Sequence, residues 1–405
     1  MSVSTLIESL SQHCRDQVSG RHVLAISDTS EINLQAHIGR LNDEEIGVVG
    51  NDTDIGFFIH PTLVVDSSNG LPLGLSTVQV WTRPVERQRK TKHDYHNRPI
   101  EEKESYKWIE SAKGSQLCFE LGHAHQVTYI GDSESDIYEP WVQIYQTNRH
   151  LLIRACQNRV LANSDQRLFE YVADQPISGQ YTLEIPADSR SKRTARDATM
   201  AVRFTPLILP CPKRLKGKYP DQVSLYAVEA VEVNPPPGQQ AVHWRLLTTH
   251  PIETYEQALQ MIQWYRWRWH IEQLFAILKQ RGLDIEASQQ ESMVAIQKLC
   301  MLALSVAVRI LQLTLGRDHQ TASDSIVLNQ TQQQCLEQIA QTVNGRTTKQ
   351  HNPHPLHSLA WAAWVIARLG GWSGYQSQRS PGIVTFARGL QQFEGIFLGW
   401  QLAHP

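Results

Sequence analysis

The chain has 405 residues, of which 41% are hydrophobic and 19% are charged, and its formal net charge is −2. This length predicts a sizeable core divided among two or three subdomains, and the near-neutral charge excludes a globally basic nucleic-acid binder, so any DNA-binding surface must be a local cluster. The six cysteines form no Cys-x2-Cys pair, which argues against a disulfide framework or a zinc site and predicts reduced thiols.

The N-terminus and the longest apolar stretch predict a soluble, cytoplasmic protein. The opening residues, MSVSTLIESLSQHCRD, are polar within their first turns and lack the apolar run of a signal peptide. The longest apolar stretch, LCMLALSVAV, has ten residues and lies between Lys298 and Arg309. Because ten residues are too few to span a bilayer, this stretch predicts a buried helix.

The first half of the chain alternates between predicted strands and helices. Residues 4–18 predict a short amphipathic helix, and HVLAISDTS predicts a buried strand with a polar end. Two apolar runs joined by DSSNGLP predict a β-hairpin with Asn-Gly in its turn. The remaining segments predict a helix (IEEKESYKWIESAKG), a strand, turn and helix (QVTYIGDSESDIYEPWVQIYQ) and a strand (HLLIRACQ). This order predicts an α/β fold with a mixed sheet.

The second half predicts a β-rich insertion and then a helical region. Short alternating strands fill residues 176–250, separated by basic or proline-rich turns such as NPPPGQQ. From residue 253 onward the pattern is helical, and LHSLAWAAWVIARLGG ends at the helix stop Gly370–Gly371. We therefore expect these boundaries: an N-terminal helix (1–20), a first catalytic segment (21–175), the β-rich insertion (176–250), a helix closing the catalytic fold (251–290) and a helical C-terminal region (291–405).

The helix that opens the C-terminal half carries an unusual polar face in YRWRWHIEQLFAILKQ. At 100° per residue, the positions of Tyr265, Arg268, Glu272 and Lys279 fall at about 0°, 300°, 340° and 320°, within one sector of about 60°. A tyrosine, two cations and a carboxylate on one stripe suit a metal ion and several phosphates, with the tryptophans packed on the opposite side. A solvated helix face with salt bridges explains the same spacing equally well.

Two aspartates follow predicted apolar strands directly. Asp28 comes after VLAIS and Asp132 after VTYIG, which is where an α/β fold presents active-site groups. Each of them also fits a turn or helix-cap residue. Within GDSESD, Asp132 competes with Glu134 and Asp136, and we favour Asp132 because it alone follows the strand directly. A divalent metal requires several hard oxygen ligands, so these carboxylates are candidates together with Glu272.

These segments resemble the catalytic segments of DDE transposases. AISDTS, GDSESDIYE and the Tyr-x2-Arg-x3-Glu-x6-Lys spacing are similar to the bacterial IS-four family with the YREK signature, of the Tn-five type. GFFIHPTLVV, EKESYKW, RWHIEQLF and WAAWVIARLGG extend the resemblance over nearly the whole chain from about residue 5. The resemblance implies an RNase H-like catalytic fold and a cut-and-paste transposase.

The resemblance also implies a metal site and its chemistry. Asp28, Asp132 and Glu272 would be the catalytic carboxylates and would bind two Mg²⁺ or Mn²⁺ ions, roughly 3.5–4 Å apart, that serve in-line attack by water and then by a DNA 3′-hydroxyl.

DNA contacts are expected on the YREK face and in the insertion. The resemblance implies that Tyr265, Arg268 and Lys279 contact phosphates of the transposon end. Between residues 190 and 218 the sequence has nine basic residues against the single acid Asp197, and a solvated loop is the alternative interpretation of such a run. Beside a DNA-cutting site this charge predicts salt-sensitive DNA binding. Within this run, Lys192, Arg193 and Arg196 are the candidates.

Members of this family cut the second strand through a DNA hairpin, for which a base leaves the stack. Trp244 in AVHWRLLTT matches the stacking tryptophan of the family, and Arg154 in LLIRACQ matches a nearby arginine. The alternative for Trp244 is a strand residue in the core.

The resemblance further implies a homodimer on DNA, with its contact near LHSLAWAAWVIARLGGW. The apolar residues of this helix cover too much of its circumference for a one-sided surface helix, so they are buried either within one chain or against a second. Full-length members carry an N-terminal DNA-recognition region, whereas Met1 lies 27 positions before Asp28, so we expect that region to be missing. The alternatives are therefore a truncated remnant that inhibits through mixed dimers and a stand-alone RNase H-like nuclease. A bacterial, nucleoid-associated enzyme is the leading expectation.

Overall fold

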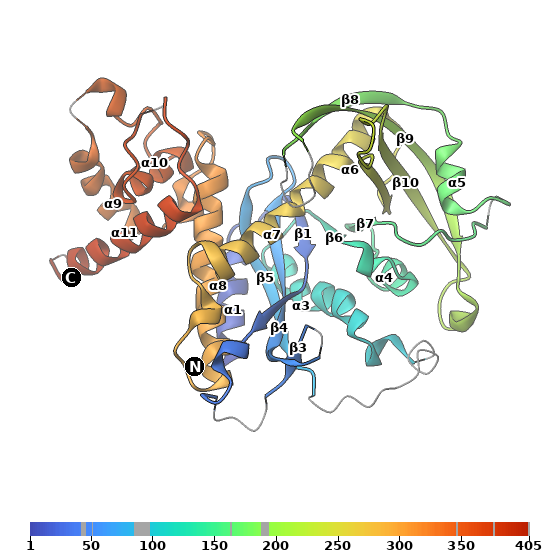
Figure 1. Cartoon of the computed structure of the whole chain (residues 1–405), viewed down its shortest axis with the longest axis horizontal. Helices are drawn as coiled ribbons and strands as arrows, with labels where there is room; N and C mark the ends of the chain where they lie inside the picture. The colour runs from blue at the N-terminus through green and yellow to red at the C-terminus, as the bar shows by residue number, and fades with distance from the viewer. Residues whose placement is uncertain are drawn as a thin grey trace. The chain divides into compact units, whose positions relative to one another are not determined.

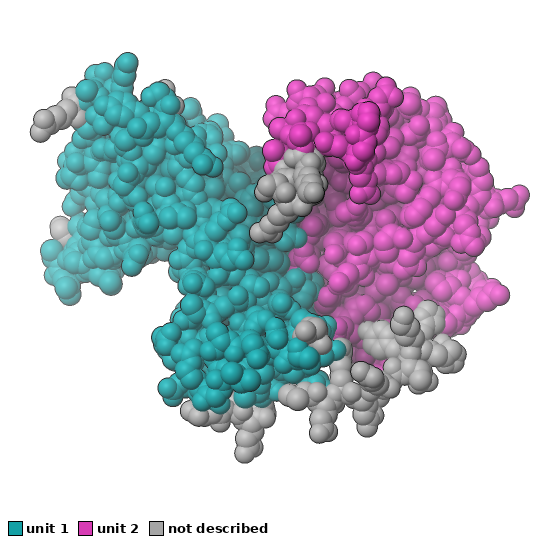
Figure 2. Space-filling model, in the orientation of Figure 1, with its two compact units in different colours: residues 1–19, 29–87, 269–405 teal, residues 20–28, 88–268 magenta. Residues whose placement is uncertain are grey.

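The computed structural model describes residues 1–41, 46–50, 52–84, 98–162, 164–187, 194–345, 347–375 and 377–403. The chain forms two compact units, coloured separately in Figure 2. Unit 1 consists of Met1–Ser19, Thr29–Arg87 and Trp269–Pro405, and unit 2 of Gly20–Asp28 and Gln88–Arg268. Each unit is therefore built from segments that are far apart in the sequence.

Unit 2 contains the parallel core of the sheet and the β-rich insertion (Figure 1). The parallel strands are β1 His22–Ser27, β6 Gln126–Gly131 and β7 Arg149–Arg154. The insertion strands are β8 Gly179–Ile185, β9 Arg196–Pro210, β10 Gln222–Glu232 and β11 His243–Thr248. Since β11 pairs antiparallel with β7 and continues to β10, β9 and β8, the insertion extends this sheet and does not form a separate layer.

The helices of unit 2 follow from apolar spacing and caps. Its helices are α3 Lys107–Leu121, α4 Tyr138–Gln143, α5 Leu168–Ala173 and α6 Tyr255–Trp267, and its short 3-10 turns are Ile100–Glu102, Glu104–Tyr106, Ser133–Ser135 and Lys213–Leu215. The start of α6 is fixed by a capping box, in which the Thr254 side chain accepts from the Gln257 backbone N–H and the Gln257 side chain accepts from the Thr254 backbone N–H. This helix packs on β9 and β10.

Unit 1 contains an antiparallel set of strands. These are β2 Ser30–Asn33, β3 Val48–Val49, β4 Asp54–Asp66 and β5 Pro72–Trp81. The predicted Asn-Gly hairpin is confirmed between β4 and β5, where Gly70 has a φ of 79° that a side chain would disfavour. The predicted N-terminal helix is confirmed as α1 Val3–Arg15, which packs on β5. Strands β2 and β3 have no counterpart among the predicted elements.

The rest of unit 1 is helical, as predicted. It comprises α7 Trp269–Ala276, a π-helical turn Ile277–Arg281, α8 Met293–Gly316, α9 Gln330–Val343, α10 Leu359–Leu369 and α11 Ile383–Ala403, with 3-10 turns at Gln35–His37, Ile285–Ala287, Asp324–Ile326 and Thr348–Gln350. The glycine stop is confirmed, since α10 ends at Leu369 and Gly371 has a φ of 89°.

Helix α10 is buried within unit 1, so the first of the two explanations for its apolar surface holds. All its residues from Leu359 to Ala367 are buried, and Trp364 is 4% exposed. Helix α11 packs so closely that a side chain at Gly389 would collide with the carbonyl of Ile366. A dimer contact through the Trp364 side chain is therefore not compatible with an intact unit 1, and the homodimer itself stays a prediction.

Helix α8 is longer than the apolar stretch that predicted it. Among the described residues it is the one helix that could cross a membrane by length and composition, and half of its most apolar window is buried in the structure. It packs on α1, β5, α10 and α11, as the core helix of a globular unit does. The prediction of a buried helix is confirmed for that half of the window.

The α/β fold class is confirmed: a mixed sheet with a β-rich insertion precedes an α-helical C-terminal region, and the RNase H-like assignment stays a prediction. The expectation of one continuous α-helix from Tyr265 to Lys279 is wrong. The backbone is assigned as α6 up to Trp267 and α7 from Trp269, and it becomes π-helical at Ile277. Because a π turn holds more residues than an α turn, the 100° spacing does not extend to Lys279. Trp269 is 61% exposed, so not all the tryptophans of this segment pack inward.

Candidate active site

Two aspartates lie side by side at the carboxyl edge of the parallel strands in unit 2. Strands β1 and β6 pair in parallel with Ile26 opposite Ile130, so Asp28 and Asp132 both follow two residues later. Adjacent strands are about 4.8 Å apart, which places the two carboxylates on neighbouring backbones at one edge. The strand-end prediction therefore brings these two residues together.

Arg268 forms an ion pair with the first of these aspartates. Its Nη1 donates to Asp28 Oδ2 over 2.6 Å, and the two side chains are only 16% and 15% exposed. Arg268 caps the C-terminal end of α6, and its backbone N–H donates to the carbonyl of Tyr265. The end of α6 thus delivers a cation to the end of β1.

The pKa of Asp132 is raised above its ordinary value. Burial raises the pKa of Asp132, and Glu134 raises it further, while a hydrogen bond from the Glu134 backbone N–H and the cations Arg268 and Lys107 lower it. The Glu134 N–H donates to Asp132 Oδ1 at 2.8 Å, which makes Asp132 the N-cap of the following 3-10 turn. Asp132 therefore caps a turn and also lies in the electrostatic field of Arg268.

Tyr265 and Arg154 belong to the same cluster. Burial raises the pKa of Tyr265, and the cations Arg268 and Arg154 oppose that rise, while Asp132 adds to it. The Tyr265 side chain also hydrogen-bonds to Arg268. Tyr265 is only 7% exposed, so in this structure its hydroxyl supports Arg268 from inside the unit.

Asp136, the rival of Asp132 in GDSESD, has a structural role. Its carboxylate is fully buried, pairs with Arg159, and accepts from the backbone N–H groups of Cys156 and Gln157 at 2.8 and 3.1 Å. These contacts tie the 3-10 turn after β6 to the chain after β7. The acceptor sites of Asp136 are already engaged in holding this loop.

Glu272 and Lys279 are carried by unit 1. Glu272 lies in α7 and is partly exposed. Lys279 lies in the π turn, where its Nζ donates to the carbonyl of Glu31 at 2.9 Å and pairs with Glu286 at 3.1 Å. Nothing in the sequence spacing marks Glu286 as a partner of Lys279. Of the four YREK residues, Tyr265 and Arg268 come together in unit 2.

Trp244 and Arg154 lie on neighbouring strands. Arg154 ends β7 opposite Leu246 of β11, and Trp244 lies two residues from Leu246, so all three project to one face of the sheet. Arg154 is exposed and Trp244 is partly exposed. Trp244 is therefore not a fully buried core residue.

The basic run of the insertion is largely neutralised where it is described. Arg196 pairs with Glu232 at 2.8 Å, and Arg203 shares the buried Glu229 with Arg245. This corrects the expectation that Arg196 faces DNA freely, because acidic residues on β10 provide partners that a local charge count overlooks. Lys192 and Arg193 lie outside the described residues.

The donors at the strand ends suit a hard divalent cation. Carboxylate oxygens are the ligands that Mg²⁺ and Mn²⁺ prefer, and Arg268 already holds a positive charge against Asp28. Within the described ranges, no three His, Cys, Asp or Glu side chains are gathered closely enough to hold an ion. What fits a metal ion here is the donor chemistry alone: two strand-end carboxylates, one of which is paired with the cation Arg268.

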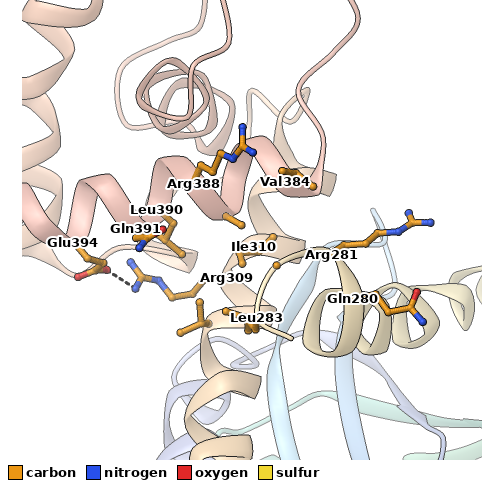
Figure 3. Close-up of a pocket in the computed structure, with 13 residues that line it drawn as sticks. Gln280, Arg281, Leu283, Arg309, Ile310, Val384, Arg388, Leu390, Gln391 and Glu394 are labelled. Carbon is orange, nitrogen blue, oxygen red and sulfur yellow. Dashed lines mark hydrogen bonds and ion pairs between the residues drawn. The ribbon is translucent and has the colours of Figure 1, made fainter. Parts of the chain in front are cut away.

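A separate pocket in unit 1 is not part of this cluster. It measures about 630 Å³ and is lined by the π turn, α8 and α11. Arg309 pairs there with Glu394 at 2.6 Å, while the side chains of Arg281 and Arg388 point away from that pair (Figure 3). We assign no ligand to this pocket.

Comparison with known proteins shows the family to which the chain belongs. A solved structure, the piggyBac transposase synaptic complex with hairpin DNA, aligns at 9% identity and a TM-score of 0.37, covering 93% of this chain and 57% of that one. The chain thus spans little more than half the length of that protein. The family described as transposase DDE domain matches residues 57–309, which include Asp132 and Glu272 and begin after Asp28. Since this match covers more than half of the 405 residues, the chain belongs to the transposase DDE domain family.

Proposed function

We propose that this chain is a metal-dependent DNA transposase of the IS-four type with a YREK signature, which cuts a transposon end and joins it to new DNA. The observation that carries the proposal is the cluster around Arg268 in unit 2. Arg268 forms an ion pair with Asp28, hydrogen-bonds to Tyr265 and acts electrostatically on Asp132. Two strand-end carboxylates beside an arginine offer the hard oxygen ligands and the phosphate-binding cation that phosphoryl transfer requires. Family membership supports the same reaction class.

The carboxylates would hold the metal. Asp28 and Asp132, with Glu272 as the third ligand, would bind two Mg²⁺ or Mn²⁺ ions. When bound, such ions activate the attacking oxygen and stabilise the leaving oxygen in an in-line displacement at phosphorus. The chain's own residues orient the DNA: Arg268 and Lys279 offer cations to backbone phosphates, and Tyr265 holds Arg268 in place.

Trp244 and Arg154 would act on the second strand. An indole face can hold a base that has left the stack, at about 1–3 kcal/mol per base. Arg154, on the same face of the sheet, would bind the adjacent phosphate during hairpin formation. Two copies of the chain would hold the two transposon ends, so a homodimer on DNA is part of the proposal.

Strand cleavage of a supercoiled plasmid with Mg²⁺ or Mn²⁺ tests the carboxylates. D28N, D132N and E272Q should each abolish nicking while leaving the circular dichroism spectrum unchanged. Glu134→Gln is the matched control, because Glu134 lies in the same turn but is exposed and pairs with Lys107. Wild-type activity in D132N would refute the assigned site. Nicking without any strand joining would favour a stand-alone nuclease instead.

A further inference from the structure

Arg268 contacts the aspartate that the proposed metal needs. The 2.6 Å distance between Nη1 and Asp28 Oδ2 is that of a charge-assisted hydrogen bond, and both side chains are largely shielded from water. A divalent cation and the guanidinium would therefore compete for the same carboxylate oxygen. Both cannot bind that oxygen together at full strength, since like charges repel.

The guanidinium also has a role beyond Asp28. The Tyr265 side chain hydrogen-bonds to it, and the Arg268 backbone N–H donates to the carbonyl of Tyr265 at 3.1 Å. Two carboxylates on adjacent strand ends repel each other when both are ionised, and Arg268 offsets that repulsion. Arg268 is therefore the internal counter-charge of this edge of the sheet.

A released guanidinium requires a new anion. Its planar fork matches a phosphate as well as a carboxylate, and it stays charged at any working pH. When a metal takes over the neutralisation of Asp28, the nearest chemically suitable partner is a backbone phosphate of the DNA. The Arg268 backbone is held at the C-terminal end of α6, so the exchange needs only a rotation of the Arg268 side chain.

Resting on the proposed function, we propose that Arg268 is a positioning residue that exchanges partners: it holds Asp28 in the absence of metal and moves to a DNA phosphate when a divalent cation binds Asp28. Metal binding and DNA binding then strengthen each other. By linkage, the factor by which metal raises DNA affinity equals the factor by which DNA raises metal affinity. Removing the guanidinium should abolish this coupling while making metal binding alone easier.

The first test measures Mn²⁺ binding to the full chain without DNA by isothermal titration calorimetry. R268Q should bind Mn²⁺ about tenfold more tightly than the wild type, which corresponds to about 1.4 kcal/mol. R268K should restore the weaker wild-type affinity because it keeps the charge. The matched control is R266Q, since Arg266 is an exposed cation two positions earlier whose Nη1 donates to Gln263. This control should leave the affinity unchanged.

The second test measures the coupling itself. The affinity for a fluorescent duplex is recorded with and without Mn²⁺, and a gel verifies that the duplex stays intact. The wild type and R266Q should bind DNA more tightly with Mn²⁺, and in R268Q that gain should disappear. A merely structural role of Arg268 would weaken DNA binding equally under both conditions.

The outcomes separate the two proposals. If R268Q binds Mn²⁺ no more tightly than the wild type, or keeps the full metal-dependent gain in DNA affinity, the exchange of partners is wrong. D28N reports on the proposed function, because loss of Mn²⁺ binding in D28N supports Asp28 as a ligand. Wild-type Mn²⁺ binding in D28N would refute the metal site itself.

Discussion

Replacing Asp136 with alanine should destabilise the protein strongly, whereas replacing Asp132 with asparagine should not. The Asp136 carboxylate is fully buried and engages Arg159 and two backbone N–H groups, those of Cys156 and Gln157. Alanine removes the carboxylate that accepts all of these bonds and leaves Arg159, 17% exposed, with the backbone carbonyl of residue 136 but no counter-charge there. Removing one member of a buried ion pair costs about 3–5 kcal/mol, and each buried donor left without an acceptor costs about 1–3 kcal/mol.

Asp132 is the matched comparison in the same turn. Asparagine caps a helical turn as well as aspartate does, so D132N keeps the hydrogen bond from the Glu134 N–H. Burial raises the pKa of Asp132, which means that its ionised form costs folding free energy above that pKa. At neutral pH a neutral amide removes this cost. The stability of D132N should therefore equal or slightly exceed that of the wild type.

Urea unfolding followed by circular dichroism measures both variants, and plasmid nicking measures activity. We expect D136A to lose about 3–5 kcal/mol of unfolding free energy, in line with the cost of breaking a buried pair. D132N should lose nicking without losing stability. The assignment of Asp132 would be refuted if the D136A variant is stable but no longer cleaves DNA while the D132N variant still cleaves it. The catalytic role would then belong to Asp136.

Trp364→Asp should lower the unfolding free energy by at least about 3 kcal/mol, because Trp364 is 4% exposed within unit 1. A variant that stays folded and changes only its oligomeric state in light scattering would contradict this. Neutralising the exposed Lys213 and Lys216 should reduce the steepness of log DNA affinity against log salt concentration by about 1.8, since each phosphate contact contributes about 0.9. An unchanged slope would mean that DNA does not bind at these two lysines. Burial, with His150 and His22 nearby, lowers the pKa of His250 from 6.5 to about 3. Below pH 6.5 the unfolded state therefore binds a proton that the folded state refuses, and stability falls by about 2 kcal/mol between pH 6.5 and 5. H250Q should flatten this pH profile of urea unfolding, and a profile as steep as that of the wild type would exclude His250 as its source.

Several features followed from the sequence because their causes are local. The largely apolar runs VLAIS and VTYIG predict strands, because strands covered on both faces are rich in apolar residues, and the structure pairs the two in parallel. The Asn69–Gly70 turn and the glycine stop after α10 are backbone requirements of single residues, and the structure has both. The position of Asp28 and Asp132 at strand ends was also readable, since parallel strands end at one edge of a sheet.

Tertiary structure decided which charges pair with which. Arg268 lies 240 positions from Asp28, and Arg196 lies 36 positions from Glu232, so no periodicity could predict either contact. For the same reason a count of basic residues between 190 and 218 overstated the free charge of the insertion. Asp132 and Asp136 are both acids of one short turn in the sequence, and only the fold surrounds Asp136 with the donors that make it structural. Pairing is decided by distance in space, and sheet register and helix ends set that distance only once the whole unit has folded.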